Sequence, residues 1–311
     1  MHTLIVAAVM TALLWAVGPD LATAQYGVFS KEDMLKYTAL YKGERFPDGR
    51  PKVPDSVLRQ LRGAVLEDIW GPLKKHGKAT VDNPGRWKHE YDFQMAMGFK
   101  VMHPHRPLVG RAVTAMFMPA RGDINDVIER DGKADGRKGP QNTWAIDQLV
   151  EGDVLVVDLF GKINKGTMVG DGLATTIASK VGPDGGLVID GAVRDADGIF
   201  EIPDYNTYAR DYHYSALGDV MLMGYNTPVR IGEAVCMPGD VVVGTMEGVV
   251  FIPAHIAAKV AADVEIGTLR VIWMKQRIKE GKYTYTESHT KKGPIQEDFE
   301  QWLKEYKAKQ N

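Results

Sequence analysis

The sequence predicts an α/β fold, and two observations carry this prediction. The phrase Gly-Asp-Val occurs at 152–154, 218–220 and 239–241, each time directly before an apolar run. A turn that leads into a β-branched run is typical of a buried strand. The second observation is a strand, a helix and another strand within the 37 residues from Val154 to Asp190, which is the length of a βαβ unit.

Two amphipathic helices are predicted before the sheet. Ser30 and Asp33 have the spacing of a capping box, so a first helix is expected to begin there and to end before Gly43. Asp55 is expected to cap a second helix, because apolar residues recur at helical spacing from there until near Gly77.

Predicted strands and helices alternate from about Leu108 onward. The expected elements are a strand at 108–118, a helix at 123–130, a polar glycine-rich loop at 131–141, a helical turn or two at 144–150, a strand at 154–158, a helix at 171–180, a strand at 187–190, a strand ending at 251–253 and a helix at 255–280. A charged tail helix carries an aromatic stripe, which we expect to dock on its own domain or on a neighbouring subunit (Phe299, Trp302, Leu303, Tyr306).

The composition argues against several classes of protein. The 311 residues include 38 basic and 40 acidic ones, so the formal charge is −2. This balance gives no support to nucleic-acid binding, which normally needs a basic face. The single cysteine, Cys236, excludes an internal disulfide framework. Its apolar neighbours predict a buried thiol without a catalytic role.

The amino-terminal segment has the features of an export signal. Leu4–Val17 is an uncharged run of 14 residues, too short to span a bilayer comfortably and of the right length for a signal-peptide core. The small residues Ala22 and Ala24 favour cleavage before Gln25. We therefore expect residues 1–24 to be removed, the mature protein to be periplasmic or secreted, and no stable membrane insertion. An uncleaved anchor or a buried first helix is the alternative.

Residues suited to chemistry cluster after two of the predicted strands. The glycine-rich segment 166–172 precedes a helix, and the free N–H groups at a helix start favour an anion such as a small carboxylate. Arg194 and Asp195 follow the next strand, and an open α/β sheet gathers ligands at the carboxyl ends of its strands. Arg194 can hold a carboxylate through two bonds, and Asp195 suits Mg²⁺ or Mn²⁺. The alternative is an Arg–Asp pair that only staples the loop.

The stretch from Leu108 to Pro253 resembles the RraA-like family (ribonuclease-activity-regulator-A-like proteins). That family includes divalent-metal-dependent 4-hydroxy-4-methyl-2-oxoglutarate aldolases that also decarboxylate oxaloacetate, and members that bind and inhibit a ribonuclease. The resemblance implies an αββα sandwich with a swivelling β/β/α core, built into trimers. The segments that carry it are 109–114, 152–158, Gly166 with Gly170–Asp171, 186–195, 228–230, 238–240 and 247–250.

The resemblance also implies a role for individual residues. Asp195 would bind the metal ion, and Arg194 would hold the substrate carboxylate and stabilise the enolate. Asp171 would order the water around the ion and pass a proton. Glu247 stands near the place of an acidic residue that the family presents from the adjacent subunit. The backbone of the 166–171 loop would hold the pyruvate end of the substrate (Met168, Val169, Gly170, Asp171).

The implied function is that of a class II (metal-dependent) aldolase or an oxaloacetate decarboxylase-like lyase, with Mg²⁺ or Mn²⁺ as cofactor. It would act on a small 2-keto acid through a pyruvate enolate, as a homotrimer or hexamer. No Schiff-base lysine is required, and Lys162 and Lys165 are expected to be surface residues. Two alternatives stay open: a non-catalytic interaction protein on the same scaffold, and metal-dependent enolate chemistry on an exported sugar acid.

The predicted domain organisation places a catalytic domain at 56–264, between helical extensions at 25–55 and 265–311. The segment 203–227 looks longer than its counterpart in the family and includes four closely spaced tyrosines (Tyr205, Tyr208, Tyr212, Tyr214). We expect it to line a larger substrate pocket. Among the histidines, His103 and His105 are expected to lie at the surface or to serve in packing. His213 is a candidate for substrate contact.

Overall fold

The computed structural model describes residues 27–77, 91 and 94–309, so the predicted signal peptide lies outside the described residues. The strands are β1 (Met95–Met97), β2 (Lys100–Val101), β3 (Leu108–Pro119), β4 (Asp153–Val169), β5 (Gly186–Val193), β6 (Asn206–Tyr212), β7 (Val220–Tyr225), β8 (Val229–Ile231), β9 (Ala234–Cys236), β10 (Val241–Gly244) and β11 (Gly248–Ile252). The helices are α1 (Lys31–Tyr37), α2 (Asp55–Leu61), α3 (Leu66–Gly77), α4 (Gly122–Ala134), α5 (Gln141–Ile146), α6 (Asp171–Val181), α7 (Ala196–Phe200), α8 (Ala257–Lys279), α9 (Tyr285–Ser288) and α10 (Gly293–Ala308).

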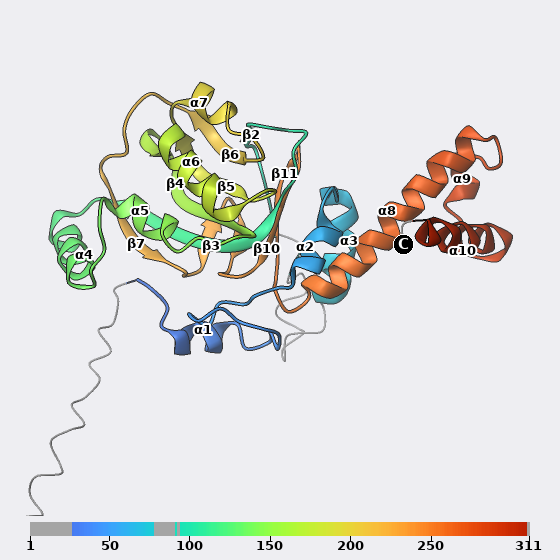
Figure 1. The fold of residues 1–311 in the computed structure, drawn as a ribbon, viewed down its shortest axis with the longest axis horizontal. Coiled ribbons are helices and arrows are strands. Elements are labelled where there is room, and N and C mark those ends of the chain that lie inside the picture. Colours follow the sequence, from blue (N-terminus) through green and yellow to red (C-terminus); the bar gives the residue numbers. More distant parts are fainter. Residues whose placement is uncertain (1–26, 78–90, 92–93, 310–311) are drawn as a thin grey trace, which may run out of the picture.

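A nine-stranded mixed sheet forms the centre of the molecule (Figure 1). Its strand order is β1-β11-β10-β3-β4-β5-β6-β2, and β7 also pairs with β3. The neighbours β3, β4, β5 and β6 run parallel. The unit β4–α6–β5 is the predicted βαβ crossover, and each Gly-Asp-Val phrase stands at the start of a strand, namely β4, β7 or β10. The predicted α/β class is therefore confirmed.

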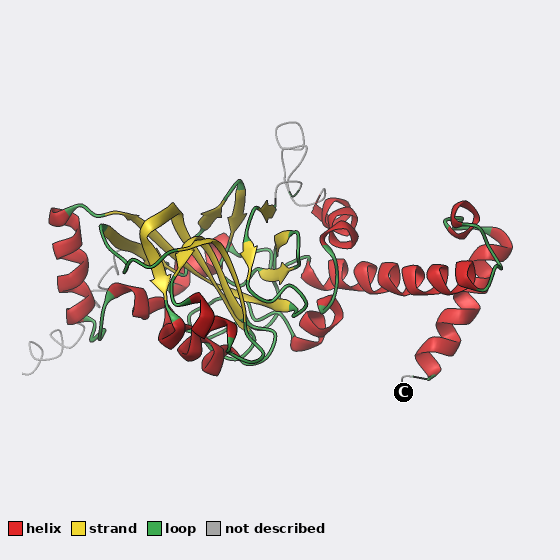
Figure 2. Cartoon of the chain, turned by 90° about the horizontal axis from the view of Figure 1, so that it is seen from above, coloured by secondary structure: helices red, strands yellow, loops and turns green. Residues whose placement is uncertain are grey.

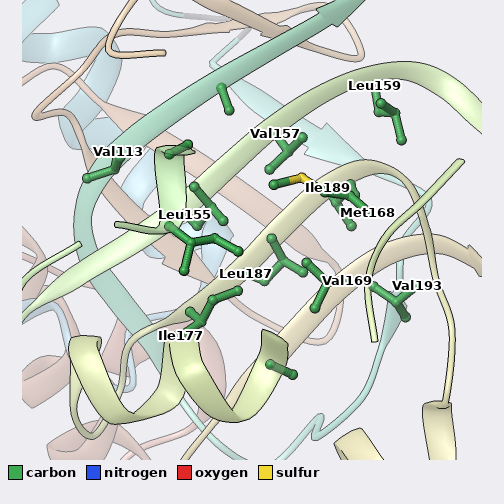
Figure 3. Close-up of a cluster of buried hydrophobic side chains, with 14 of the residues drawn as sticks. Val113, Leu155, Val157, Leu159, Met168, Val169, Ile177, Leu187, Ile189 and Val193 are labelled. Carbon is green, nitrogen blue, oxygen red and sulfur yellow. The ribbon is translucent and has the colours of Figure 1, made fainter. Parts of the chain in front are cut away.

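The main core lies between the parallel strands and helices α5, α6 and α7. Figure 3 shows side chains of β4, β5 and α6 meeting in this cluster, among them Leu155, Leu187 and Ile177. All three are fully buried. Burial of this size stabilises the sheet by roughly 1.5–3 kcal/mol for each large side chain. The core thereby fixes the carboxyl ends of β4 and β5 relative to each other.

Strand β4 differs most from the prediction. It continues from Asp153 to Val169, so Gly166 to Val169 belong to a strand rather than to a loop. Its pairing with β5 is irregular after Asp158, where the partners jump to Lys162 and then to Thr167. The extra residues are accommodated as bulges, which a strand tolerates at the rim of a sheet.

The second predicted helix is interrupted. The structure has α2 and α3 instead, separated by residues 62–65, and Gly63 in this break has a φ of +81°. Asp55 is the first residue of α2 rather than its cap, and its carboxylate instead pairs with Arg111. The predicted loop at 131–141 is also shorter, because α4 continues to Ala134.

A second layer of helices covers the other end of the sheet. Helices α2, α3 and α8 pack on β3, β10 and β11 (Figure 1), and the buried residues include Leu61, Ile69, Val243, Ile252 and Val260. The predicted boundary between residues 264 and 265 falls inside α8, which runs without a break to Lys279. The domain division itself stays a prediction.

The carboxyl-terminal helices form an arm beyond the sheet. Figure 2 shows α8 projecting from the body and α10, which leads to the C-terminus, turning back at an angle to it. The aromatic stripe of α10 packs on this arm, with Phe299 and Trp273 at 5.5 Å between ring centroids. The tail therefore docks on its own chain. In the described parts of the chain, no helix has the length and apolar character that a membrane span needs.

Candidate functional site

The segments that follow β4 and β5 meet at one edge of the sheet. The two strands are parallel, with Val169 opposite Val193. The backbone N–H of Arg194 donates to the carbonyl of Val169 over 3.0 Å. Helix α6 begins at Asp171 and α7 at Ala196, so both helix starts lie at this edge. The structure thus brings together the two segments that the sequence marked as chemically important.

Gly170 lies directly against the side chains of Arg194 and Asp195. A Cβ atom at Gly170 would come within 2.5 Å of Asp195 Oδ2 and 3.0 Å of Arg194 Nε. The φ of Gly170 is −109°, which any residue adopts, so glycine is needed here for space rather than for backbone conformation. Its missing side chain leaves room for the Arg–Asp pair.

Arg194 and Asp195 form an open ion pair. Arg194 Nε lies 3.4 Å from Asp195 Oδ2, and the two side chains are 43% and 49% exposed. Asp195 has a left-handed backbone (φ +53°) and stands at the cap of α7 without capping it through its side chain. Half-exposed groups at a single long contact keep capacity for further bonds. Their geometry therefore suits a ligand better than a closed staple.

Asp171 is a further acidic group at this edge. It is exposed, and its Oδ1 accepts a 2.7 Å hydrogen bond from the N–H of Gly172. Gly198 of α7 approaches it closely, because a Cβ atom there would lie 2.9 Å from Asp171 Oδ2. The start of α6 also favours negative charge at this point. Asp171 is thus held between the two helix starts.

The backbone before Gly170 is buried and held from behind. Met168 and Val169 are buried side chains of the core. The side-chain amide of Asn142 on α5 donates to the carbonyl of Met168 over 2.9 Å. Sequence analysis missed Asn142 and Gly198, because each acts on a residue distant in the chain. A glycine shortly after Arg-Asp was the only local signal.

Glu247 lies away from these residues in the same chain. It is exposed in the turn between β10 and β11. Gly244 at the end of β10 pairs with Leu108 at the start of β3, and β3 runs parallel to β4 and β5. The turn is therefore at the opposite edge of the sheet from Arg194, and a contribution of Glu247 to this site would have to come from a second copy.

The tyrosine-rich segment lies mostly in the core. Tyr205 and Tyr208 are fully buried, and burial raises the pKa of both phenols well above its usual range. Tyr212 is partly buried in β6, whereas Tyr214 is exposed. The expectation that all four tyrosines line a pocket is wrong for Tyr205 and Tyr208, because each packs into a buried hydrophobic cluster, Tyr205 just before β6 and Tyr208 within it.

The other candidates occupy ordinary positions. His103 is buried and stacks on Phe200 at 4.9 Å between ring centroids, which is a packing role, and His105 is exposed. Lys165 is exposed and pairs with Asp219 at 2.7 Å, and Lys162 is partly exposed. Cys236 is buried, and burial raises the pKa of its thiol well above the usual value.

The donor set at this edge fits a hard divalent cation. Within the described ranges, no three His, Cys, Asp or Glu side chains gather in a way that could enclose an ion. Mg²⁺ needs less than that, since it keeps several waters and often takes one or two carboxylates. The exposed carboxylate of Asp195, with the cradle at Gly170 beside it, meets this requirement.

The family model that matches this chain is RraA-like (Aldolase/RraA), over residues 82–251. This match covers more than half of the sequence, and the chain belongs to the RraA-like family. A curated relative from Halalkalibacterium halodurans is named as a candidate 4-hydroxy-4-methyl-2-oxoglutarate aldolase. It is 30% identical over 112 residues, which cover 35% of this chain and 50% of the relative. The chain thus spans about half the length of that relative.

Solved structures of similar proteins confirm the fold. A protein from Pseudomonas syringae pv. tomato superimposes with a TM-score of 0.58 at 20% identity, covering 76% of this chain and 98% of its own. RraAS2 of Streptomyces coelicolor, an unusual member of the RNase ES inhibitor RraA family, gives a TM-score of 0.57 at 23% identity, with coverage of 73% and 100%. At these identities the likeness concerns the fold alone.

Proposed function

We propose that the protein is a divalent-metal-dependent carbon–carbon lyase that cleaves or decarboxylates a 2-keto acid through a pyruvate enolate. The observation that carries this proposal is the open Arg194–Asp195 pair beside Gly170, at the edge where α6 begins. A guanidinium and a carboxylate within 3.4 Å of each other supply one group for a substrate carboxylate and one for a cation. The family and the named aldolase relative support the same reaction class.

Asp195 would hold Mg²⁺ or Mn²⁺ through its carboxylate. When bound, the ion would polarise the keto oxygen of the substrate. Arg194 binds the substrate carboxylate with its planar fork, and its charge balances the enolate as it forms. Asp171, exposed at the start of α6, passes the proton that converts the enolate to pyruvate. Met168, Val169 and Gly170 provide the rigid backbone floor for the pyruvate end.

The assembly proposed for this site is a homotrimer or a hexamer. Glu247 lies at the opposite edge of its own sheet, so a neighbouring copy would have to supply it as the further acidic residue. The proposed location is the periplasm or the outside of the cell, supported by the uncharged run Leu4–Val17.

The test is release of pyruvate from oxaloacetate in the presence of Mg²⁺ or Mn²⁺. We expect turnover by the native protein, loss of metal binding in Asp195→Ala, and a raised KM with a lowered kcat in Arg194→Ala. Asp123→Ala is the matched control, because Arg121 and Asp123 form another exposed pair, at 2.8 Å on α4. That variant should bind metal normally. No turnover with either metal and no metal bound at Asp195 would contradict the proposal and favour a non-catalytic interaction protein.

A further inference from the structure

The residues after β6 stand beside the Arg–Asp pair. Strand β6 is parallel to β5, and Tyr212 is the register partner of Val193. The backbone N–H of His213 donates to the carbonyl of Val193 over 3.0 Å. His213 therefore follows the end of β6 as Arg194 follows the end of β5. The two side chains start from matching positions on neighbouring strands, which lie about 4.8 Å apart.

The segment from His213 to Ser215 is fixed to β4. Ser215 Oγ accepts a 2.7 Å hydrogen bond from the N–H of Lys165 and lies 2.9 Å from Nδ1 of His213. The hydroxyl of Thr167 donates to the carbonyl of Ser215. Two of these bonds join the segment to the strand that leads into Gly170, and the contact between Ser215 and His213 orders the segment internally. A group carried by such a segment is ordered before any ligand arrives, which lowers the entropy cost of binding.

Tyr214 is an exposed aromatic ring on this ordered segment. Its ring stacks on the imidazole of His213 at 4.6 Å between centroids and 23° between planes. Tyr214 is nevertheless 91% exposed. The imidazole of His213 covers one face of the phenol ring, and the rest of the ring is open. The other ring of the predicted tyrosine set at this end of β6, Tyr212, is partly buried. Tyr214 alone of the four is available as a surface for a ligand.

We propose that the His213–Tyr214 pair is a specificity platform that binds an aromatic ring on the distal end of the 2-keto acid. This inference rests on the proposed function, since it needs a keto acid held at Arg194. A flat two-ring stack offers offset stacking to a third ring, an interaction worth about 0.5–1.5 kcal/mol beyond area burial. The substrate class is then a 4-aryl-4-hydroxy-2-oxobutanoate.

The cleavage of such a substrate is a balanced retro-aldol step. The hydroxyl on C4 loses its proton, its oxygen forms the carbonyl of an aryl aldehyde, and the C3–C4 bond breaks. The electron pair of that bond passes to C3 and gives the pyruvate enolate. Protonation of C3 completes pyruvate, so the products are pyruvate and the aldehyde. No oxidant, reductant or third reactant takes part.

The platform is tested by binding, which does not depend on turnover. The probes are pyruvate and 2-oxo-4-phenylbutanoate. The second compound lacks the C4 hydroxyl, so the retro-aldol step cannot cleave it. Both are titrated into the protein by calorimetry with Mg²⁺ present. We expect Tyr214→Ala to weaken binding of the phenyl compound about three- to tenfold and to leave pyruvate binding unchanged. Tyr214→Phe keeps the ring and should behave as the native protein.

A matched control is available at the far end of the chain. Tyr285 is 67% exposed and lies 4.3 Å from His289 between ring centroids, on the arm formed by the last helices. Tyr285→Ala should bind both probes normally. If native protein binds pyruvate and turns over oxaloacetate, but Tyr214→Ala binds the phenyl compound as tightly as native protein, the platform is wrong and the proposed function stands. Equal weakening for both probes also contradicts the platform, whereas no pyruvate binding at all contradicts the function.

Discussion

Two Arg–Asp pairs in this protein have opposite surroundings. Arg50 binds Asp153 through two bonds of 2.8 and 3.0 Å, and the side chains are 3% and 0% exposed. Arg194 and Asp195 meet through one contact of 3.4 Å and are half exposed. Residue type is the same in both cases. The two pairs differ in whether their remaining hydrogen-bonding groups face protein or solvent. Only the Arg194–Asp195 pair can therefore bind a ligand.

The buried pair ties the amino-terminal segment to the sheet. Arg50 precedes α2, whereas Asp153 is the first residue of β4. Burial raises the pKa of Asp153, and the charge and hydrogen bonds of Arg50 lower it in part. Asp153 also accepts from the N–H of Val150 over 3.0 Å. Burying both charges of such a pair costs desolvation free energy. Removing only one partner destabilises the protein more, because the other charge stays buried without its partner.

The largest effect is expected when the buried pair is broken. Asp153→Asn keeps an acceptor for Val150 but removes the buried counter-charge of Arg50, which then has only the half-exposed Asp48, at 4.0 Å, to balance it. We expect the free energy of unfolding to fall by about 3–5 kcal/mol, measured by urea denaturation. The double variant Arg50→Met/Asp153→Leu removes both charges and should regain most of this loss. A single variant as stable as the native protein would show that the pair is not a staple.

Asp240 sharpens the comparison, because it is a buried aspartate with no arginine. It accepts from the N–H groups of Met237 and Ala254 over 2.9 and 3.3 Å. In the chain that the structure describes, no cationic side chain pairs with it. Burial raises the pKa of Asp240 to about 7, with the backbone hydrogen bonds opposing the rise. Folding therefore favours its protonated form.

The sign of the pH dependence follows from this raised pKa. The unfolded chain releases the proton of Asp240 near pH 4, whereas the folded protein holds it until about pH 7. Its contribution to stability is full below pH 4 and is lost as pH rises through 7. Two pH units within this window correspond to about 2–3 kcal/mol. We expect native protein to lose about this much between pH 5 and 8, and Asp240→Asn to lose less.

Urea denaturation at pH 5 and pH 8 compares the two proteins directly. The asparagine retains an oxygen that can accept from Met237 or Ala254, so the variant is expected to fold. Parallel loss of stability in native protein and Asp240→Asn would assign the pH dependence to other groups.

The sequence was sufficient for features that depend on neighbours in the chain. The Gly-Asp-Val turns and the βαβ unit follow from local periodicity, and Ser30 with Asp33 forms the predicted capping box of α1. The edge at which Arg194 meets Gly170 follows from the general geometry of parallel strands. These predictions hold because sheet direction and strand ends determine them without reference to individual contacts.

Contacts between distant residues could not be predicted in this way. Asp55 carries the mark of a helix cap, yet its carboxylate pairs with Arg111, 56 residues away. Asn142 supports Met168 across 26 residues. In each case tertiary packing decides between two locally acceptable states, and a single sequence contains no measure of that packing.

A smaller effect on stability is expected when a side chain added at Gly170 displaces the open pair. In Gly170→Ala the new methyl group would push against Asp195 Oδ2 and against Nε and Cγ of Arg194, which belong to two half-exposed side chains. The side chains can move, so the free energy of unfolding should change by less than about 1 kcal/mol. Metal affinity should nevertheless fall about 10- to 100-fold, as when the surroundings of a ligand are disturbed.

Gly172→Ala is the matched control for this change. It lies two residues further on in α6, and a Cβ atom there would meet nothing within 4 Å. Calorimetric titration with Mn²⁺ should give the native affinity for Gly172→Ala and a weaker one for Gly170→Ala. Equal affinities would mean that the cradle at Gly170 does not shape the site.

The smallest effect on stability is expected when the aspartate of the open pair is replaced by asparagine. Asp195→Asn matches Asp153→Asn in chemistry, and asparagine tolerates the left-handed backbone found here. Because Arg194 stays in contact with water, it keeps its hydration, and the free energy of unfolding should change by no more than about 0.5 kcal/mol. Metal binding should be lost, since the amide is a neutral ligand. A destabilisation close to that of Asp153→Asn would show instead that Arg194 and Asp195 hold the fold together, and the site would then have to be sought elsewhere.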